Sequence, residues 1–166
     1  MDLPSPKSFT NAMRALVGNC SVITAGEGED RSGLLVTSAI SLSADRKFGW
    51  SSLGADHQKV AENFSGFGGV KGADRYNGAT WETAETGALL LEGAPAAFDC
   101  ELEEMIDRAT HSIVIGRVRA IRHNVAAGAL VYWNGAFKKL HPEWELSDSK
   151  KRSGPEETSG RYFLHA

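Results

Sequence analysis

Short apolar runs separated by polar, glycine-rich stretches fill most of the chain, and several of them have the two-residue period of a β-strand. Strands are predicted at residues 20–25, 34–43, 97–106, 111–122, 130–133 and 136–140. Asn134-Gly135 separates the last two runs and is the strongest short signal for a β-hairpin. The pattern therefore predicts a protein rich in antiparallel strands.

Two segments have helical spacing instead. The first begins at Ser5-Pro6 and ends at Gly18-Asn19, because proline favours the first helical position and glycine often follows a helix end. Its apolar residues recur on one predicted face: Phe9, Met13, Leu16 and Val17. The second helix is predicted from Asp56, as its N-cap, to Phe64. Val60, Ala61 and Phe64 are expected to face inward.

The predicted strand at residues 97–106 has one apolar face and one acidic face. Its predicted apolar face consists of Phe98, Cys100, Leu102 and Ile106, with Glu104 as the exception. Asp99, Glu101 and Glu103 fall on the other face. Paired carboxylates can serve acid–base catalysis, but this spacing is typical of the solvent side of an antiparallel strand. A solvated acidic face is the favoured interpretation.

The many strands and few helices show no regular alternation, which favours a β-barrel or sandwich over a doubly wound fold. We expect one domain at residues 1–140 and a polar C-terminal tail at 141–166. After His141 the chain turns mostly polar through Gly160, and residues 147–160 have little to bury.

Composition and charge exclude several functional classes. The net charge is -3 and no block of lysine or arginine forms a nucleic-acid footprint. No apolar stretch approaches the ~20 residues of a membrane span, and the N-terminus lacks a signal-peptide pattern. Cys20 and Cys100 lie far apart, so buried reduced thiols are expected. No metal-ligand spacing is present. A cytoplasmic protein without a metal is therefore predicted.

The ordered set of segments resembles the flavin reductase-like family, the FMN-binding split β-barrels that include the reductase components of two-component flavin-dependent monooxygenases. The resemblance runs from about Phe9 to Phe137 and rests on five segments: residues 9–14, 33–45, 56–66, 93–100 and 110–118. It implies a mainly β fold, a Greek-key split β-barrel with two or three flanking helices. Periodicity alone does not distinguish this barrel from other β folds.

The resemblance implies a flavin site on the predicted strand at 34–43. Its small and hydroxyl residues would let a flat flavin ring approach the backbone closely, while backbone amides donate hydrogen bonds. The candidates are Thr37, Ser38, Ala39, Ser41 and Ser43. The alternative is an ordinary strand that carries serine and threonine.

Two further places complete the candidate site. Phe64, Ser65 and Gly66 would line the flavin cleft, unless the loop at 66–72 is simply a surface loop. His111 opens an aliphatic strand and would lie beside the nicotinamide or the flavin edge, where an imidazole can donate a hydrogen bond. The alternative for His111 is a strand-end residue satisfied by backbone. The other histidines are expected at the surface: His57, His123, His141 and His165.

The chain departs from the family between Asp45 and Arg46. Similar proteins carry another strand and a serine-rich loop there, which helps to hold the flavin phosphate. A barrel that lost this strand would have two open edges. The segment is either truly absent from the protein, which would cripple the barrel and the phosphate site, or present in the native protein and missing from this sequence. The second explanation is favoured, and it predicts that Asp45 and Arg46 are too far apart for one peptide bond.

The resemblance implies an NAD(P)H:flavin oxidoreductase, in which hydride passes from NADH or NADPH to FMN or FAD. Reduced flavin would then leave for a partner monooxygenase. A homodimer is expected, since barrels of this kind pair and build the flavin site near the seam. The alternative is a flavin- or haem-binding split-barrel protein without reductase activity. A structural or interaction domain is the third and weakest alternative.

Overall fold

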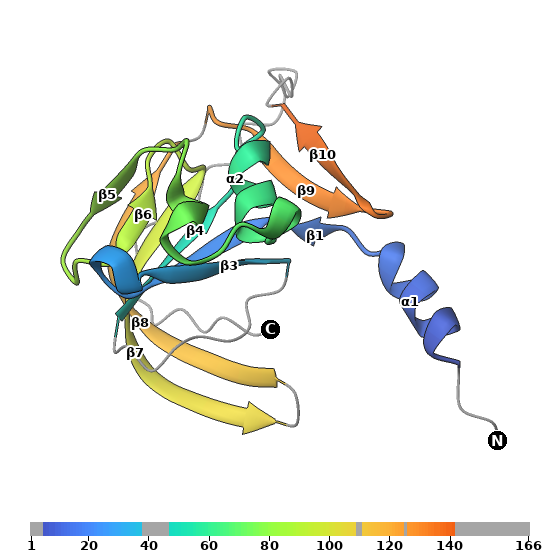
Figure 1. Ribbon diagram of the computed structural model, residues 1–166, viewed down its shortest axis with the longest axis horizontal. Helices are drawn as coiled ribbons and strands as arrows, with labels where there is room; N and C mark the ends of the chain where they lie inside the picture. The colour runs from blue at the N-terminus through green and yellow to red at the C-terminus, as the bar shows by residue number, and fades with distance from the viewer. Residues whose placement is uncertain (1–4, 38–46, 109–110, 125, 142–166) are drawn as a thin grey trace, which may run out of the picture.

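The computed structural model describes residues 5–37, 47–108, 111–124 and 126–141. Figure 1 shows three sheets, with one long two-stranded arm below and one helix that projects to the side. The strands are β1 (Gly18–Asn19), β2 (Ser21–Ala25), β3 (Ser32–Val36), β4 (Lys47–Ser52), β5 (Trp81–Thr83), β6 (Leu89–Leu91), β7 (Ala96–Arg108), β8 (His111–His123), β9 (Ala129–Trp133) and β10 (Ala136–Leu140). The helices are α1 (Pro6–Arg14) and α2 (Gln58–Phe64), with short 3₁₀ turns η1 (Gly28–Asp30), η2 (Phe67–Gly69) and η3 (Gly72–Tyr76).

The main sheet has five antiparallel strands in the order β3-β2-β4-β7-β8. All five residues of β2 are buried, as expected for a strand with partners on both sides. Within the described residues the sheet is not closed, and β3 and β8 are its edges. The mainly β class is confirmed, and the open sheet is consistent with a split barrel. The predicted break between Asp45 and Arg46 lies outside the described residues.

Two apolar clusters lie on the two faces of this sheet. Val22 and Ile23 are neighbours in β2 and therefore point to opposite faces. Val22 belongs to the larger cluster, in which Leu53, Phe64, Leu90 and Leu130 are almost completely buried. Ile23 belongs to the smaller cluster, with Val36, Phe48 and Cys100. The larger cluster joins α2 and β6 to the sheet.

The arm formed by β7 and β8 is longer than predicted, with 13 residues in each strand. The pairing register shifts between Leu102 and Glu104, which leaves Glu103 as an extra residue on β7. Such a β-bulge reverses the side-chain alternation beyond it. This explains why Glu104 breaks the predicted apolar pattern.

The predicted hairpin at Asn134-Gly135 is confirmed. Both residues have positive φ, 49° for Asn134 and 81° for Gly135. These are the values that a two-residue type I′ turn requires, and asparagine and glycine adopt them with the least strain. Strands β9 and β10 pair along their whole length, and β9 also pairs with β1.

Two predicted helix features are wrong. Asp56 does not cap the second helix; α2 begins at Gln58, and its N-cap residue is His57. The first helix ends at Arg14, before Leu16 and Val17. Its apolar face is not packed on the sheet: Phe9 is 63% exposed, and Figure 1 shows α1 extending away from the body. Hydrogen bonds from Asn134 N–H to Arg14 and from Trp133 Nε1 to Ala15 hold its C-terminal end.

Candidate functional site

The C-terminal end of α2 carries three of the candidate flavin residues. The Phe64 ring is buried and packs edge-on against Tyr76, with ring centroids 5.0 Å apart. A Cβ on Gly33 of β3 would lie only 2.6 Å from that ring. Phe64 is therefore part of the core under β3, and the accessible groups here come from Ser65 and Gly66.

Ser65 is exposed, and its hydroxyl donates to the Glu62 carbonyl oxygen over 2.7 Å. Its oxygen can still accept a hydrogen bond. Gly66 follows with φ of 75°, a left-handed conformation that glycine adopts readily. A Cβ at Gly68 would meet no atom within 4 Å, so open space lies above this turn. The turn therefore offers unobstructed backbone to a flat ligand.

Thr37 directly follows β3 at its C-terminal end, where it is exposed and lies beside Gly18, since a Cβ added at Gly18 would lie 2.7 Å from the Thr37 Cβ. Four residues separate it from Gly33, which is about 13 Å along a strand. Thr37 and the Ser65–Gly66 turn thus lie near opposite ends of the same edge strand. The other candidates on the predicted strand, Ser38, Ala39, Ser41 and Ser43, fall outside the described residues.

His111 is the first residue of β8 and pairs with Arg108 at the tip of the arm. In Figure 1 this tip lies at the bottom, on the far side of β3 from α2. A single chain therefore does not bring His111 together with Ser65 and Gly66. His123, at the other end of β8, is exposed, as is His141. His165 lies outside the described residues.

The prediction of a surface position is wrong for His57. It is half-buried, and its Nδ1 accepts a hydrogen bond from the Gly54 N–H over 3.0 Å. Burial lowers the pKa of His57 below its ordinary value of 6.5, while the nearby Asp56 carboxylate acts in the opposite direction. The imidazole is thus held neutral over more of the acid range than a free histidine. No periodicity in the sequence marks this residue, because its environment comes from a fold-back of the backbone at Gly54.

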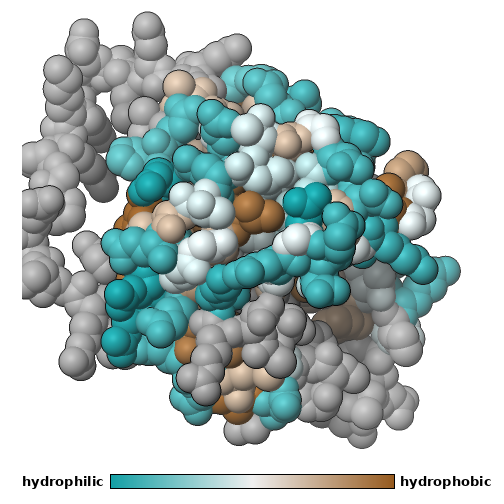
Figure 2. Space-filling view, turned by 60° about the vertical axis from the view of Figure 1, so that its left-hand side comes forward, coloured by the Kyte–Doolittle hydropathy of each residue, from teal (hydrophilic) through white to brown (hydrophobic). Residues whose placement is uncertain are grey.

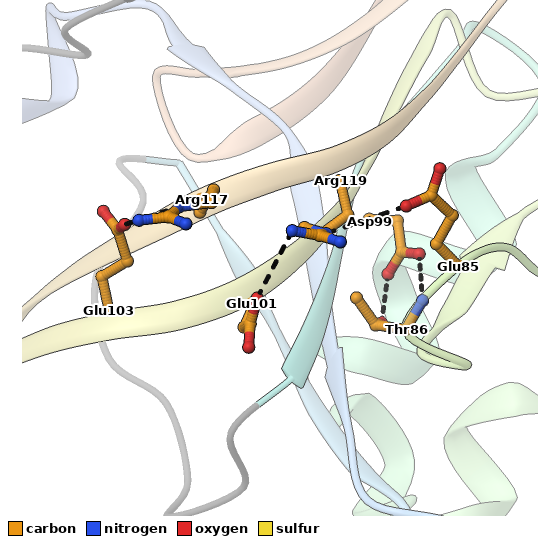
Figure 3. Close-up of polar contacts among 7 residues, drawn as sticks. All are labelled: Glu85, Thr86, Asp99, Glu101, Glu103, Arg117 and Arg119. Atoms are coloured by element: carbon orange, nitrogen blue, oxygen red, sulfur yellow. Dashed lines mark hydrogen bonds and ion pairs between the residues drawn. The ribbon is translucent and has the colours of Figure 1, made fainter.

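The prediction of a solvated acidic face on β7 is wrong for Asp99. Asp99 has no exposed surface, and its carboxylate accepts from the backbone N–H of Thr86 over 2.7 Å and from the Thr86 hydroxyl. Figure 3 shows both contacts beside the exposed ion pairs of the arm. Glu103 pairs with Arg117 over 2.5 Å, and Arg119 lies 3.9 Å from Glu101. These residues bind one another, so they do not form a catalytic pair.

Cys20 and Cys100 are free and buried, as predicted. Burial raises the pKa of the Cys20 thiol to about 11 and that of Cys100 to about 12. Both are therefore inert thiols at neutral pH. Across the described ranges, no three histidine, cysteine or acidic side chains are grouped to hold a metal. In the same ranges, no helix is long and apolar enough to span a membrane.

Comparison with known proteins identifies the class. Residues 44–141 match the flavin reductase like domain, and the chain belongs to this family. An FMN reductase (NADH) RutF 2 of Rhizobium rhizogenes is 34% identical over 99 residues, which cover 60% of this chain and 56% of that protein. An FMN reductase (NADH) RutF of Pseudomonas syringae is 33% identical over 93 residues, with coverage of 56% and 51%. The chain thus spans about half the length of these two relatives.

Solved structures support the same fold. BorF, the flavin reductase component of a bacterial two-component tryptophan halogenase, superposes with a TM-score of 0.69 at 26% identity. The superposition covers 82% of this chain and 99% of that one. The split-barrel fold expected from the sequence is therefore shared by a solved flavin reductase.

Proposed function

We propose that this protein is an NAD(P)H:flavin oxidoreductase that uses FMN or FAD. The observation that carries the proposal is the match of residues 44–141 to the flavin reductase like domain. Two relatives are named FMN reductase (NADH), which favours FMN and NADH as the pair. BorF suggests a further step, in which reduced flavin is supplied to a partner monooxygenase or halogenase.

The described part of the candidate site fits a flavin. The ring needs flat, open backbone and neutral hydrogen-bonding groups, and the Gly66–Gly69 turn and the Ser65 hydroxyl have both properties. Thr37 offers a second exposed hydroxyl, about 13 Å along the strand from Gly33. Ser38, Ala39, Ser41 and Ser43, which lie outside the described residues, are proposed as further flavin ligands on the grounds of the sequence alone. The domain would comprise residues 1–140, followed by the tail at 141–166.

When bound, the flavin supplies the redox chemistry, since it accepts a hydride from the nicotinamide. The chain's own residues need only bind the two rings face to face and exclude water. Ser65 and Thr37 would fix the flavin, and His111 would donate a hydrogen bond to the nicotinamide or the flavin edge. A buried acid or base is not required, which agrees with the structural role of Asp99.

We further propose a homodimer as the functional unit. His111 lies at the tip of the arm, away from Ser65 and Gly66, so a second copy could bring it to the flavin. The arm has an apolar surface for such a contact: Ile113 and Ile115 lie on one face and are 50% and 40% exposed. Figure 2 shows hydrophobic patches between hydrophilic residues, one of them toward the bottom of the view. With its two reduced thiols, the protein would function in the cytoplasm.

The direct test of the activity is oxidation of NADH and NADPH by the purified protein with free FMN or FAD. We expect turnover with at least one of the four pairs, and quenching of flavin fluorescence at micromolar protein. The same preparation without flavin is the control. If the protein neither quenches flavin fluorescence nor turns over any of the four pairs, the proposed function is excluded.

Replacing His111 with alanine is expected to lower kcat/KM for the nicotinamide nucleotide about ten- to a hundredfold, while the flavin affinity changes little. The reason is the loss of one hydrogen bond to a charged or strongly polar partner, worth roughly 1.5–3 kcal/mol. His123→Ala, an exposed histidine on the same strand, is the matched control and should retain full activity. A His111→Ala enzyme with the original rate would remove His111 from the site.

Replacing Ile113 with glutamate is expected to convert the dimer to a monomer, because a charge would be placed in an apolar contact. Light scattering after size-exclusion chromatography measures this as a halving of the molar mass. Leu140→Glu is the control, since Leu140 is apolar and 52% exposed but lies in β10, away from both the arm and the proposed flavin site. A dimer that persists in Ile113→Glu, or an unmodified chain that is monomeric, would contradict the proposed interface.

A further inference from the structure

A cleft of about 390 Å3 opens at the N-terminal end of α2, the end opposite Ser65 and Gly66. Three segments line it: residues 56–60, 78–80 and 91–93. The buried side chains of Val60 and Leu91 give it an apolar floor. A hydrogen bond of 3.1 Å from the Glu92 N–H to the Thr80 carbonyl ties two of the walls together. Two of the three walls are therefore linked, and the volume is within the range of small-molecule sites.

His57 gives this cleft a directed hydrogen-bond donor. Because Nδ1 accepts from the Gly54 N–H, the proton of the neutral imidazole must be on Nε2. A Cβ added at Gly93 would lie 4.0 Å from that Nε2, so the donor edge of the ring faces Gly93, a cleft residue. Nε2 makes no hydrogen bond to another residue of the described chain. It is thus available to a molecule in the cleft.

The charges around the cleft limit what it can hold. Asp56 and Glu92 contribute two negative charges, and Lys59 contributes one positive charge. Lys59 is already 3.9 Å from the Glu62 carboxylate. An anion would meet a net negative rim without a free cation close to the imidazole. The apolar floor and the N–H donor of His57 favour a neutral ligand.

We propose that this cleft is a second binding site, which takes a neutral, mainly apolar small molecule with a hydrogen-bond acceptor. The apolar part of the molecule lies on Val60 and Leu91, and its acceptor atom accepts a hydrogen bond from the Nε2–H of His57. The seven residues of α2 separate this site from Ser65 and Gly66 by about 10 Å, at 1.5 Å per residue. The site does not depend on flavin reduction, and its ligand need not be a redox substrate.

Titration followed by amide NMR shifts of the full chain tests the proposal, with benzamide as the probe. We expect benzamide to shift the amides of Gly78, Thr80 and Gly93, and to bind about two- to tenfold more tightly than toluene, which has no acceptor. Benzoate should bind more weakly than benzamide because of its charge. Equal affinity for benzamide and toluene, or benzamide shifts outside the cleft, would overturn the proposal. If FMN shifts the same amides, the cleft belongs to the flavin site and the proposal is overturned.

The His57→Asn variant isolates the donor. Asparagine can still accept from the Gly54 N–H, but its shorter side chain does not reach the position of Nε2. The preference for benzamide over toluene should disappear in His57→Asn and persist in the control His123→Asn. If His57→Asn does not fold, the Nε2 resonance of His57 in the unmodified chain gives the answer. It should move on addition of benzamide and stay in place with toluene, and the absence of this difference would overturn the proposal.

Discussion

Asp99→Ala is expected to destabilise the protein by about 3–5 kcal/mol, the largest effect of any single carboxylate in the described chain. The change removes two hydrogen bonds to a charged acceptor, each worth roughly 1.5–3 kcal/mol, and leaves the backbone N–H of the half-buried Thr86 without this partner. Urea unfolding followed by tryptophan fluorescence measures the loss as a lower transition midpoint.

The matched control is Glu103→Ala on the same strand. Glu103 is exposed and pairs with Arg117 in solvent, so its removal should cost less than about 1 kcal/mol. Equal losses in the two variants would mean that the contact between Asp99 and Thr86 does not stabilise the fold. Asp99→Asn should fall between them, because the amide keeps one acceptor oxygen.

Gly49→Ala is expected to lower the free energy of unfolding by about 1–3 kcal/mol or more, because the added methyl group would overpack the core. Gly49 lies on β4, where β6 crosses the sheet. A Cβ there would overlap the Leu89 carbonyl oxygen and lie 2.5 Å from Thr24 Oγ1. The obstacle is backbone, and Thr24 Oγ1 already donates to the same carbonyl over 2.5 Å, so neither group can move without breaking this contact. Thermal unfolding measures the loss as a lower Tm.

Gly116→Ala on β8 provides the comparison. Its Cβ would also approach another residue closely, but the obstacle is the ring of Phe48, at 2.5 Å. A side chain at the end of a rotatable bond can shift at lower cost than a strand backbone. Gly116→Ala should therefore lower the Tm by less than Gly49→Ala. The reverse order would contradict the close packing of β6 on β4.

Local signals in the sequence predicted the parts of the fold that depend on neighbouring residues. Asn134-Gly135 specifies its own turn, and the alternation of residues 97–106 identified the core-facing Cys100 and Leu102. The alternation also placed Asp99 on the opposite face, which is correct. It could not reveal that the segment containing Thr86 covers that face, because this contact joins residues that are not neighbours in the chain. The burial of Asp99 is a tertiary feature.

The candidate site was predictable only in part for the same reason. The spacing of Val60, Ala61 and Phe64 correctly gave the buried side of α2, and Ser65 is exposed beside it. The role of Phe64 differs from the prediction in detail, since its ring fills the core beneath Gly33. His57 gave no signal, because both its hydrogen bond to Gly54 and the cleft beside it arise from backbone paths that periodicity does not encode.

The position of β8 at an edge of the main sheet bears on how the protein avoids uncontrolled self-association. Its 13 residues present one unpaired row of backbone groups, within the described chain, to which a strand of another molecule could add. Arg117, Arg119 and Arg122 lie along this edge and are all exposed. Two copies of β8 aligned edge to edge would bring these long charged side chains together. The same strand that offers an apolar face for a specific partner thus carries, along its edge, charges that disfavour growth into aggregates.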